Sequence, residues 1–185
     1  ALAVRDGRAI VRCAEGGAGG LVSKTISRHA ATPPTPNMAE IPHGMGMVNT
    51  ETWSELPPEQ WIDREYRIAR EAGLPLIVSL GYSADDIGWL APRIKPFADA
   101  VELSTHYIGE DAAPMIDAIR AAKAVLDVPV FVKLSPLGRE MTRAAEQAEV
   151  QVRDRRFTAV PRELLGGERD AMWNDVVLAE APEVL

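Results

Sequence analysis

The 185 residues of the chain are enough for one domain, or for one domain and part of a second. Hydrophobic residues make up 46% of the chain and charged residues 25%, as in proteins that fold. The formal net charge of -7 argues against general nucleic-acid binding and a polybasic membrane anchor, because both depend on clustered Lys and Arg. No apolar run approaches the ~20 residues that cross a bilayer, so we expect no membrane association. The single cysteine, Cys13, argues against an internal disulfide or a multi-cysteine zinc site and favours a cytoplasmic setting.

Strand-like and helix-like segments alternate along the chain. The β-branched run at 21–26 predicts a strand, and the apolar stripe within 59–72 predicts a helix that ends at Gly73. The continuous apolar run at 74–80 is typical of a parallel strand buried on both faces. The next predicted elements are a helix that Ser83 caps and that runs to about 94, a strand at 100–105, a helix at 111–126, a strand at 128–134 and a helix at 139–148. This alternation predicts an α/β fold with βαβ units and a parallel sheet.

Two segments break the alternation. Residues 28–50 are rich in Pro and Gly and are predicted to form a long loop, which is more often functional than accidental. After about residue 147 the pattern changes to an alternating, Arg-rich strand at 151–165 and a helix at 166–185. We therefore expect a domain over 1–147 and a segment of different origin over 148–185. Because the chain begins at Ala1 without a methionine, we also expect it to be a fragment.

Residues that follow strands are the candidates for chemistry, because active sites of parallel α/β sheets lie beyond the carboxyl ends of the strands. These candidates are Lys24, Asn49, the run 104–106 and Lys133. An ammonium group is costly to bury, so Lys24 and Lys133 are poor core residues. They are interpreted either as edge lysines that discourage aggregation or as cations that face an anionic or electron-rich ligand.

Other motifs carry little chemistry. The three histidines lack metal-ligand spacing, so no metal site is expected. No P-loop or dinucleotide fingerprint is present, and Gly17-Ala18-Gly19 lacks the third glycine at the required spacing. The glycines at 16–20 are equally well read as a turn between a helix and a strand.

Several motifs together resemble one known family. GAGGLVSKTIS, MVNTE, LPLIVSLGY, AVELSTHY and VPVFVKLSP, in this order over about residues 5–147, resemble the dihydroorotate dehydrogenase-like family of FMN-dependent (β/α)8 barrels. The resemblance implies a partial TIM-type (β/α) barrel, FMN as cofactor and a small-molecule substrate that is pyrimidine-like. The implied reaction is hydride transfer between the flavin and a C–C bond conjugated to a carbonyl.

The resemblance also implies roles for single residues. By position, Ala18 and Gly19 would meet the flavin through their backbone, and Lys24 would contact flavin and substrate. Asn49 would bind the substrate, and Lys133 would lie at the pyrimidine edge of the flavin.

The chain departs from the family's post-strand motif, E-L-N-L-S-C-P-N. Glu102 takes the position of the flavin-binding Asn, Thr105 that of the base, and Tyr107 that of a second substrate Asn. A threonine hydroxyl is a poor base without a helper. Thr105 and His106 are therefore the candidate catalytic residues, with His106 supplying the proton transfer, and a different carbonyl-conjugated substrate is an open alternative.

The resemblance covers an incomplete barrel. The family's first strand and the later half with its phosphate-binding loops are missing, and the predicted strands are too few to close a barrel of eight. The tail VQVRDRRFTAVPRELLGGERDAMWNDVV resembles the C-terminal part of deazaflavin-dependent nitroreductases. The residues that match are Arg162, Glu163, Leu164, Gly166, Glu168, Arg169 and Trp173.

Three functions remain open. The first is an FMN-dependent oxidoreductase of the dihydroorotate dehydrogenase-like class. The second is a non-catalytic open half-barrel whose exposed strand edges pair with another copy in a homodimer. The third is a relative of the deazaflavin-dependent nitroreductases.

Overall fold

The structure is a computed structural model that describes residues 4–41, 46–50, 52–104, 113–133, 158–159 and 177–179. Its main sheet has six strands in the order β1-β4-β5-β6-β8-β7. The parallel strands are β1 (Leu21–Val22), β4 (Leu76–Leu80), β5 (Ala100–Ser104) and β6 (Val130–Lys133). The helices are α1 (Gly7–Glu15), α2 (Pro58–Gln60), η2 (Trp61–Glu65), α3 (Tyr66–Arg70), α4 (Ala84–Ile94) and α5 (Ala113–Lys123).

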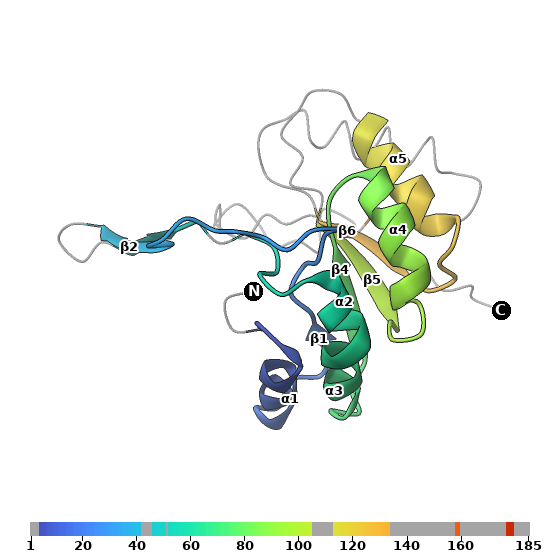
Figure 1. The fold of residues 1–185 in the computed structure, drawn as a ribbon. Coiled ribbons are helices and arrows are strands. Elements are labelled where there is room, and N and C mark those ends of the chain that lie inside the picture. The colour runs from blue at the N-terminus through green and yellow to red at the C-terminus, as the bar shows by residue number, and fades with distance from the viewer. Residues whose placement is uncertain are drawn as a thin grey trace.

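The parallel strands lie in the sheet in the order in which they occur in the chain. Right-handed crossovers between strands in such an order place their helices on one face, as in a (β/α) barrel. Figure 1 shows α4 and α5 side by side over the sheet, and α1 beside α3. The predicted α/β fold with a partial TIM-type barrel is confirmed.

The helix boundaries follow from capping side chains. The Ser83 hydroxyl accepts a hydrogen bond from the Asp86 backbone N–H at 3.1 Å, and the Asp86 carboxylate accepts one from the Ser83 N–H at 3.3 Å. This capping box satisfies donors that the first helical turn leaves unpaired, and it confirms Ser83 as the start of α4. At α1, Asp6 accepts a hydrogen bond from the Ala9 N–H at 2.7 Å in the same way.

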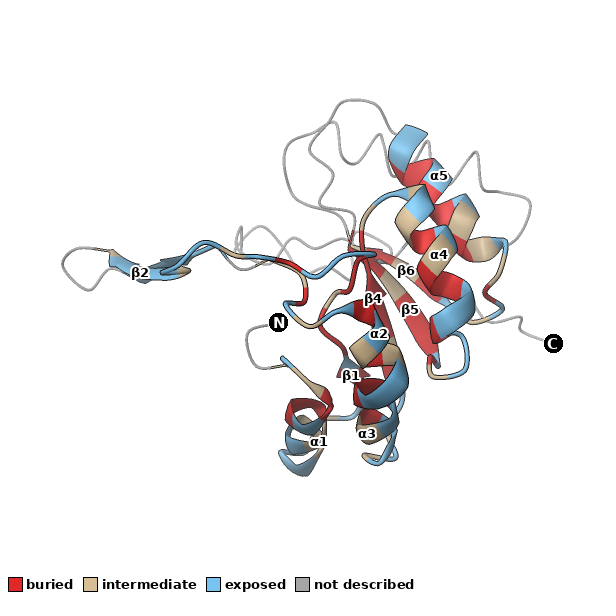
Figure 2. Cartoon of the chain, in the orientation of Figure 1, coloured by how far each residue is buried: buried red, intermediate tan, exposed pale blue. Residues whose placement is uncertain are grey.

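The core lies between the helices and one face of the sheet (Figure 2). Alternate strand residues point into it and are fully buried, and the helices supply matching apolar residues. The strand and helix members include Leu76, Val78, Leu80, Val101, Leu103, Val130, Val132, Ile87, Leu90, Ile94, Ile116 and Ile119. Burying each such side chain contributes about 1.5–3 kcal/mol, so this layer is the main source of the fold's stability.

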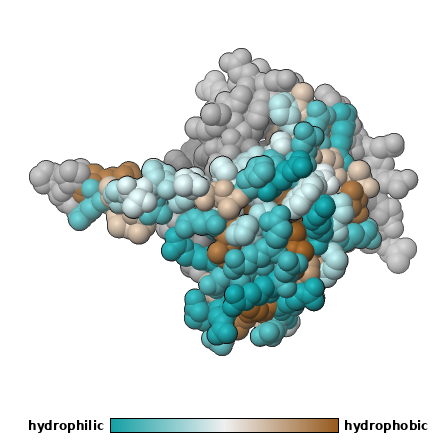
Figure 3. Space-filling view, in the orientation of Figure 1, coloured by the Kyte–Doolittle hydropathy of each residue, from teal (hydrophilic) through white to brown (hydrophobic). Residues whose placement is uncertain are grey.

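The segment at 28–50, predicted to be a loop, contains a hairpin. Strand β2 (Met38–Ile41) pairs antiparallel with β3 (Gly46–Asn49), so the loop prediction is wrong for these residues. Gly46, the first residue of β3, has φ 147°, a value that favours glycine. The hairpin projects from the sheet (Figure 1). Met47 and Val48 on it are 66% and 55% exposed. Hydrophobic surface is visible on the projecting segment (Figure 3).

The tail supplies two further strands. Strand β8 (Val177–Ala179) pairs antiparallel with β6, and β7 (Thr158–Ala159) pairs antiparallel with β8. Strand β7 falls within the strand predicted at 151–165, whereas the helix predicted at 166–185 is wrong at 177–179. The edge of β6 presents unpaired backbone groups that an added strand satisfies, which favours strand over helix here. The helix predicted at 139–148 lies outside the described residues.

No helix in the described ranges is long and apolar enough to cross a membrane.

Candidate functional site

A row of polar side chains crosses the sheet on the face opposite the helices. Thr25, Ser79, Glu102 and Lys133, here called the polar row, come from four neighbouring strand segments in the order of the sheet. The Thr25 and Ser79 hydroxyl oxygens are 2.8 Å apart, and the Ser79 hydroxyl donates to Glu102 Oε1 at 2.8 Å. The Lys133 ammonium lies 3.5 Å from the same carboxylate oxygen. Because Ser79 uses its only proton toward Glu102, Thr25 is the donor to Ser79.

The first strand reaches the row through a bulge. The Ser23 N–H donates to Ile77 O and the Ile26 N–H to Ser79 O, both at 3.0 Å. Three steps along this strand therefore match two steps along β4, so the strand contains one extra residue. The Ser23 hydroxyl fills the gap in the ladder by accepting the Ser79 N–H at 3.1 Å. The extra residue explains why the strand predicted at 21–26 pairs regularly only at β1 and again at Ile26.

The two candidate lysines are not edge lysines. Lys24 is only 3% exposed, whereas a lysine that protects a sheet edge projects into water. Lys133 lies on β6, which is flanked by β5 and β8. Its side chain is 34% exposed and pairs with Glu102. Of the two interpretations, cations held near the carboxyl ends of the strands fit this placement better.

Two polar atoms near the row have no hydrogen-bond partner in the described part of the chain. Glu102 is 18% exposed, and its hydrogen bond and its ion pair both involve Oε1, which leaves Oε2 unbonded. The Ser104 hydroxyl is fully buried and has no partner among the described residues. Ser104 lies two residues after Glu102, so both side chains are on the same face, and it is in register with Lys133. The carboxyl ends of β5 and β6 thus bring together an acceptor, a hydroxyl and a cation.

Gly81 allows a close approach at the end of β4. A Cβ added there would lie 3.3 Å from the Thr25 methyl and 3.5 Å from Ser104 O. The Gly81 N–H also donates to Ile26 O at 3.0 Å, which ties the ends of the first two strands together.

Aromatic side chains surround this end of the sheet. Tyr82 follows β4, and its ring lies edge-on to Trp53 with centroids 5.2 Å apart. Burial raises the pKa of Tyr82 to about 12, so its phenol is neutral at physiological pH. Nearby in the sequence, the Arg93 guanidinium stacks over Trp89 at 4.0 Å from the ring centroid.

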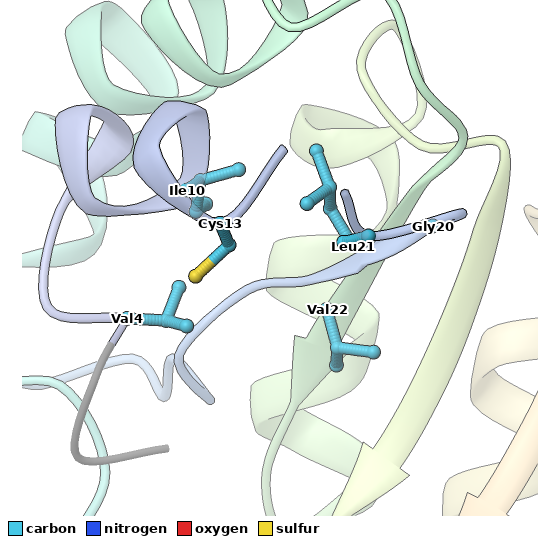
Figure 4. A pocket seen from close by; sticks show the side chains of 7 residues that line it. Val4, Ile10, Cys13, Gly20, Leu21 and Val22 are labelled. Carbon is cyan, nitrogen blue, oxygen red and sulfur yellow. The ribbon is translucent and has the colours of Figure 1, made fainter. Parts of the chain in front are cut away.

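The structure does not bring all predicted site residues together. Ala18 and Gly19 precede the amino end of β1, whereas Lys133 ends β6. Ala18 lines an apolar pocket of about 280 Å³ between α1 and β1, together with Cys13 and Leu21 (Figure 4). Their predicted contact with a flavin therefore lies at the other end of the sheet from the polar row.

The other predicted residues are spread over the molecule. Asn49 ends β3 and pairs with Met38 on the projecting hairpin. Thr105 and His106 lie outside the described residues. Ser79 and Thr25 are not among the residues predicted for the site, although the lone serine within the apolar run at 74–80 is a usable signal.

Three groups near the carboxyl ends of β5 and β6, the Lys133 ammonium, the Ser104 hydroxyl and the Glu102 carboxylate, fit the polar edge of a flavin ring in chemical type. The pyrimidine edge of that ring presents carbonyl oxygens and an N–H group, which match an ammonium, a hydroxyl and a carboxylate. No group of three or more His, Cys, Asp or Glu side chains that could hold a metal ion occurs among the residues the structure describes.

Comparison with known proteins points to one fold. No protein-family model matches the chain. The catalytic subunit of dihydroorotate dehydrogenase B (NAD(+)) from Pyrococcus horikoshii is 31% identical over 148 residues, covering 72% of this chain and 46% of that protein. The subunit of the same name from Thermoplasma volcanium is 31% identical over 153 residues, covering 75% of this chain and 50% of that protein.

A solved structure gives the same result. The ligand-free dihydroorotate dehydrogenase of Eimeria tenella superposes with a TM-score of 0.57 at 13% identity, covering 86% of this chain and 58% of that one. The chain spans about half the length of the sequence relatives that it matches. It therefore has a dihydroorotate dehydrogenase-like fold.

Proposed function

We propose that the chain is part of an FMN-dependent oxidoreductase of the dihydroorotate dehydrogenase-like class, in the cytoplasm. It would transfer hydride between the flavin and a C–C bond conjugated to a carbonyl in a small, pyrimidine-like substrate. The observation that carries the proposal is the polar row, in which Lys133 at the carboxyl end of β6 pairs with Glu102 in the middle of the neighbouring parallel strand β5. That end of the strands is where barrels of this kind bind their ligands.

The residues of the chain would bind and orient the two reactants. A bound flavin would supply the hydride chemistry itself. Lys133 would stabilise negative charge on the ring, and the buried Lys24 would add a second cation at the end of β1. Glu102 holds the Lys133 ammonium at 3.5 Å and so fixes its direction.

The remaining roles come from the family resemblance. Asn49 would bind the substrate. The flavin contacts predicted for Ala18 and Gly19 are not part of this proposal, because these residues precede the amino end of β1 and Lys133 lies at the carboxyl end of β6. Thr105 and His106 would handle the proton that accompanies hydride transfer.

The test is an absorbance spectrum of the purified protein after it has been mixed with FMN and gel-filtered. We expect a retained flavin band that bleaches when dihydroorotate or dihydrouracil is added without oxygen. Lys133→Ala should lower FMN retention at least several-fold. Lys95→Ala is the matched control, because Lys95 pairs with Asp127 at 3.3 Å at the other end of the sheet and should leave retention unchanged. A colourless protein, or equal losses in both variants, would contradict the proposal.

The alternative of a self-associating half-barrel gains no support at β6, because β8 of the same chain pairs with that strand. The nitroreductase resemblance rests on residues 162–173, which lie outside the described residues. Both remain predictions.

A further inference from the structure

Two exposed arginine side chains lie against one tryptophan ring on the helix side of the sheet. The Arg93 guanidinium carbon is 4.0 Å from the ring centroid of Trp89, and the Arg28 guanidinium carbon is 5.9 Å from it. Trp89 is half-buried on α4 and packs against the core between the helices and the sheet. These two residues, here called the arginine pair, therefore lie apart from the polar row, which is on the opposite face of the sheet.

Neither member of the arginine pair has a carboxylate partner within the described part of the chain. Arg93 donates one hydrogen bond there, to Trp89 O at 2.6 Å, and the recorded contact of Arg28 is with the ring. By contrast, Arg70 and Arg120 each pair with a carboxylate. Contact with an aromatic ring leaves a guanidinium charged, so the two cations on this ring repel each other. An anion bound beside both of them offsets that repulsion.

The backbone around Arg28 is fixed by hydrogen bonds from a second tryptophan and its neighbour. The indole N–H of Trp53 donates to His29 O at 2.7 Å, and the Ala31 N–H donates to Ser54 O at 2.8 Å. The other arginine is fixed by its hydrogen bond to the α4 backbone. Both guanidiniums are therefore positioned before a ligand arrives, which lowers the entropic cost of binding one.

We propose that the arginine pair is a binding site for a phosphate group, either free or as the monoester of a small molecule. A guanidinium offers five N–H donors in a planar fork that matches phosphate oxygens, and both members keep donors that the protein does not use. Phosphate carries close to two negative charges at neutral pH and so balances both cations, whereas a carboxylate carries one. The site goes beyond the proposed function, because it lies on the helix side of the sheet and takes no part in the polar row.

The experiment measures binding of four probes to the full chain at pH 7. Inorganic phosphate and ribose 5-phosphate carry the proposed group, and acetate and ribose are their matched probes without it. Sodium chloride holds the ionic strength constant, because salt screens exposed charges. Binding is followed by the arginine Nε–H signals in NMR spectra, and each signal is assigned by its loss in the matching alanine variant.

The proteins compared are the unmodified chain, Arg28→Ala, Arg93→Ala and Arg120→Ala. The last is the control, because it removes the same charge from an exposed ion pair with Asp117. All three arginines are exposed, so circular dichroism should show folded protein in every case.

We expect the unmodified chain to bind at least one phosphate probe saturably, with a dissociation constant about 10-fold or more below that of acetate. Each alanine change in the arginine pair should raise that constant about 10-fold or more, since it removes charged hydrogen bonds. Arg120→Ala should leave it unchanged. Equal affinities for the two phosphate probes assign the site to the phosphate group alone, and tighter binding of ribose 5-phosphate assigns it to a phosphorylated small molecule.

Three outcomes would overturn the inference. They are signal shifts that grow with phosphate without saturating, equal affinities for phosphate and acetate, and phosphate binding that survives both Arg28→Ala and Arg93→Ala. The measurement uses no flavin, so each of these outcomes would leave the proposed function standing.

Discussion

The hydroxyl of Ser79 on β4 donates to the carboxylate of Glu102 on β5 at 2.8 Å, between residues that are directly in register. The same hydroxyl receives the proton of Thr25 from the neighbouring segment. Ser79 is 1% exposed, so it connects two strands inside the molecule. The position of the Glu102 carboxylate, and with it the ion pair to Lys133, therefore depends on a residue that touches no solvent.

Replacing Ser79 with Ala should destabilise the protein and loosen Glu102. Without the Ser79 hydroxyl, the Thr25 hydroxyl loses its acceptor and the Glu102 carboxylate loses one donor. This loss lowers the free energy of unfolding by about 1–3 kcal/mol. The free energies of unfolding in urea of Ser79→Ala, Glu102→Ala and the double variant form a double-mutant cycle, because each single change removes the hydrogen bond. If the two residues act together, the double variant loses less than the sum of the single losses. Strict additivity would show that the hydrogen bond contributes nothing.

Two glycine substitutions should have opposite signs. At Gly7 an added Cβ would lie 2.3 Å from the Glu65 carbonyl oxygen, so Gly7→Ala should cost about 1–3 kcal/mol or more through overpacking. At Gly88 in the middle of α4 nothing lies within 4 Å, so Gly88→Ala should stabilise by about 0.5–1 kcal/mol. Thermal unfolding of both variants measures the contrast. A neutral Gly7→Ala would show that α1 does not pack on η2 as described.

Local signals made several elements predictable from the sequence. Ser83 and Asp86 stand three residues apart in front of an apolar stripe, and the structure forms the expected capping box there. The length and composition of the apolar runs at 74–80 and 128–134 are enough to predict strands, and these runs form β4 and β6. The family resemblance then supplied the barrel-like order of the strands.

Elements that depend on distant partners were not predictable. Val177–Ala179 lies in a segment with helical character, but pairing with the β6 edge makes it a strand. The hairpin at Met38–Asn49 was hidden among prolines and glycines that usually mark loops. At the site, the polar row needs the register between Ser79 and Glu102, and no local pattern encodes that register.

The buried Tyr66 and the half-buried Tyr82 should make the protein less stable in strong base. Burial raises the pKa of Tyr82 from 10.0 to about 12 and also raises that of Tyr66. A folded-state pKa above the unfolded one gives stability that is fully present below pH 10 and is lost as the pH rises toward 12. The urea midpoint should be lower at pH 11 than at pH 8, and Tyr82→Phe should make that difference smaller. Tyrosine absorbance that titrates entirely near pH 10 in the folded protein would contradict this prediction.

Asp99 should have the opposite effect, in acid. Its carboxylate accepts the Leu76 N–H at 2.8 Å at the start of β4 and also pairs with Arg70. The backbone hydrogen bond from Leu76, with the Arg70 side chain, lowers the pKa of Asp99 below its usual 3.8. A lowered folded-state pKa gives stability that is present above pH 3.8 and is lost as the pH falls through the lower, folded value.

Asp99→Asn should therefore flatten the acid limb of the stability profile, measured as urea midpoints between pH 2 and pH 6. Asp117→Asn is the matched control, because that carboxylate forms only an exposed pair with Arg120 at 3.4 Å, and it should leave the limb unchanged. Equal acid limbs for Asp99→Asn and the unmodified protein would mean that Asp99 does not hold the start of β4.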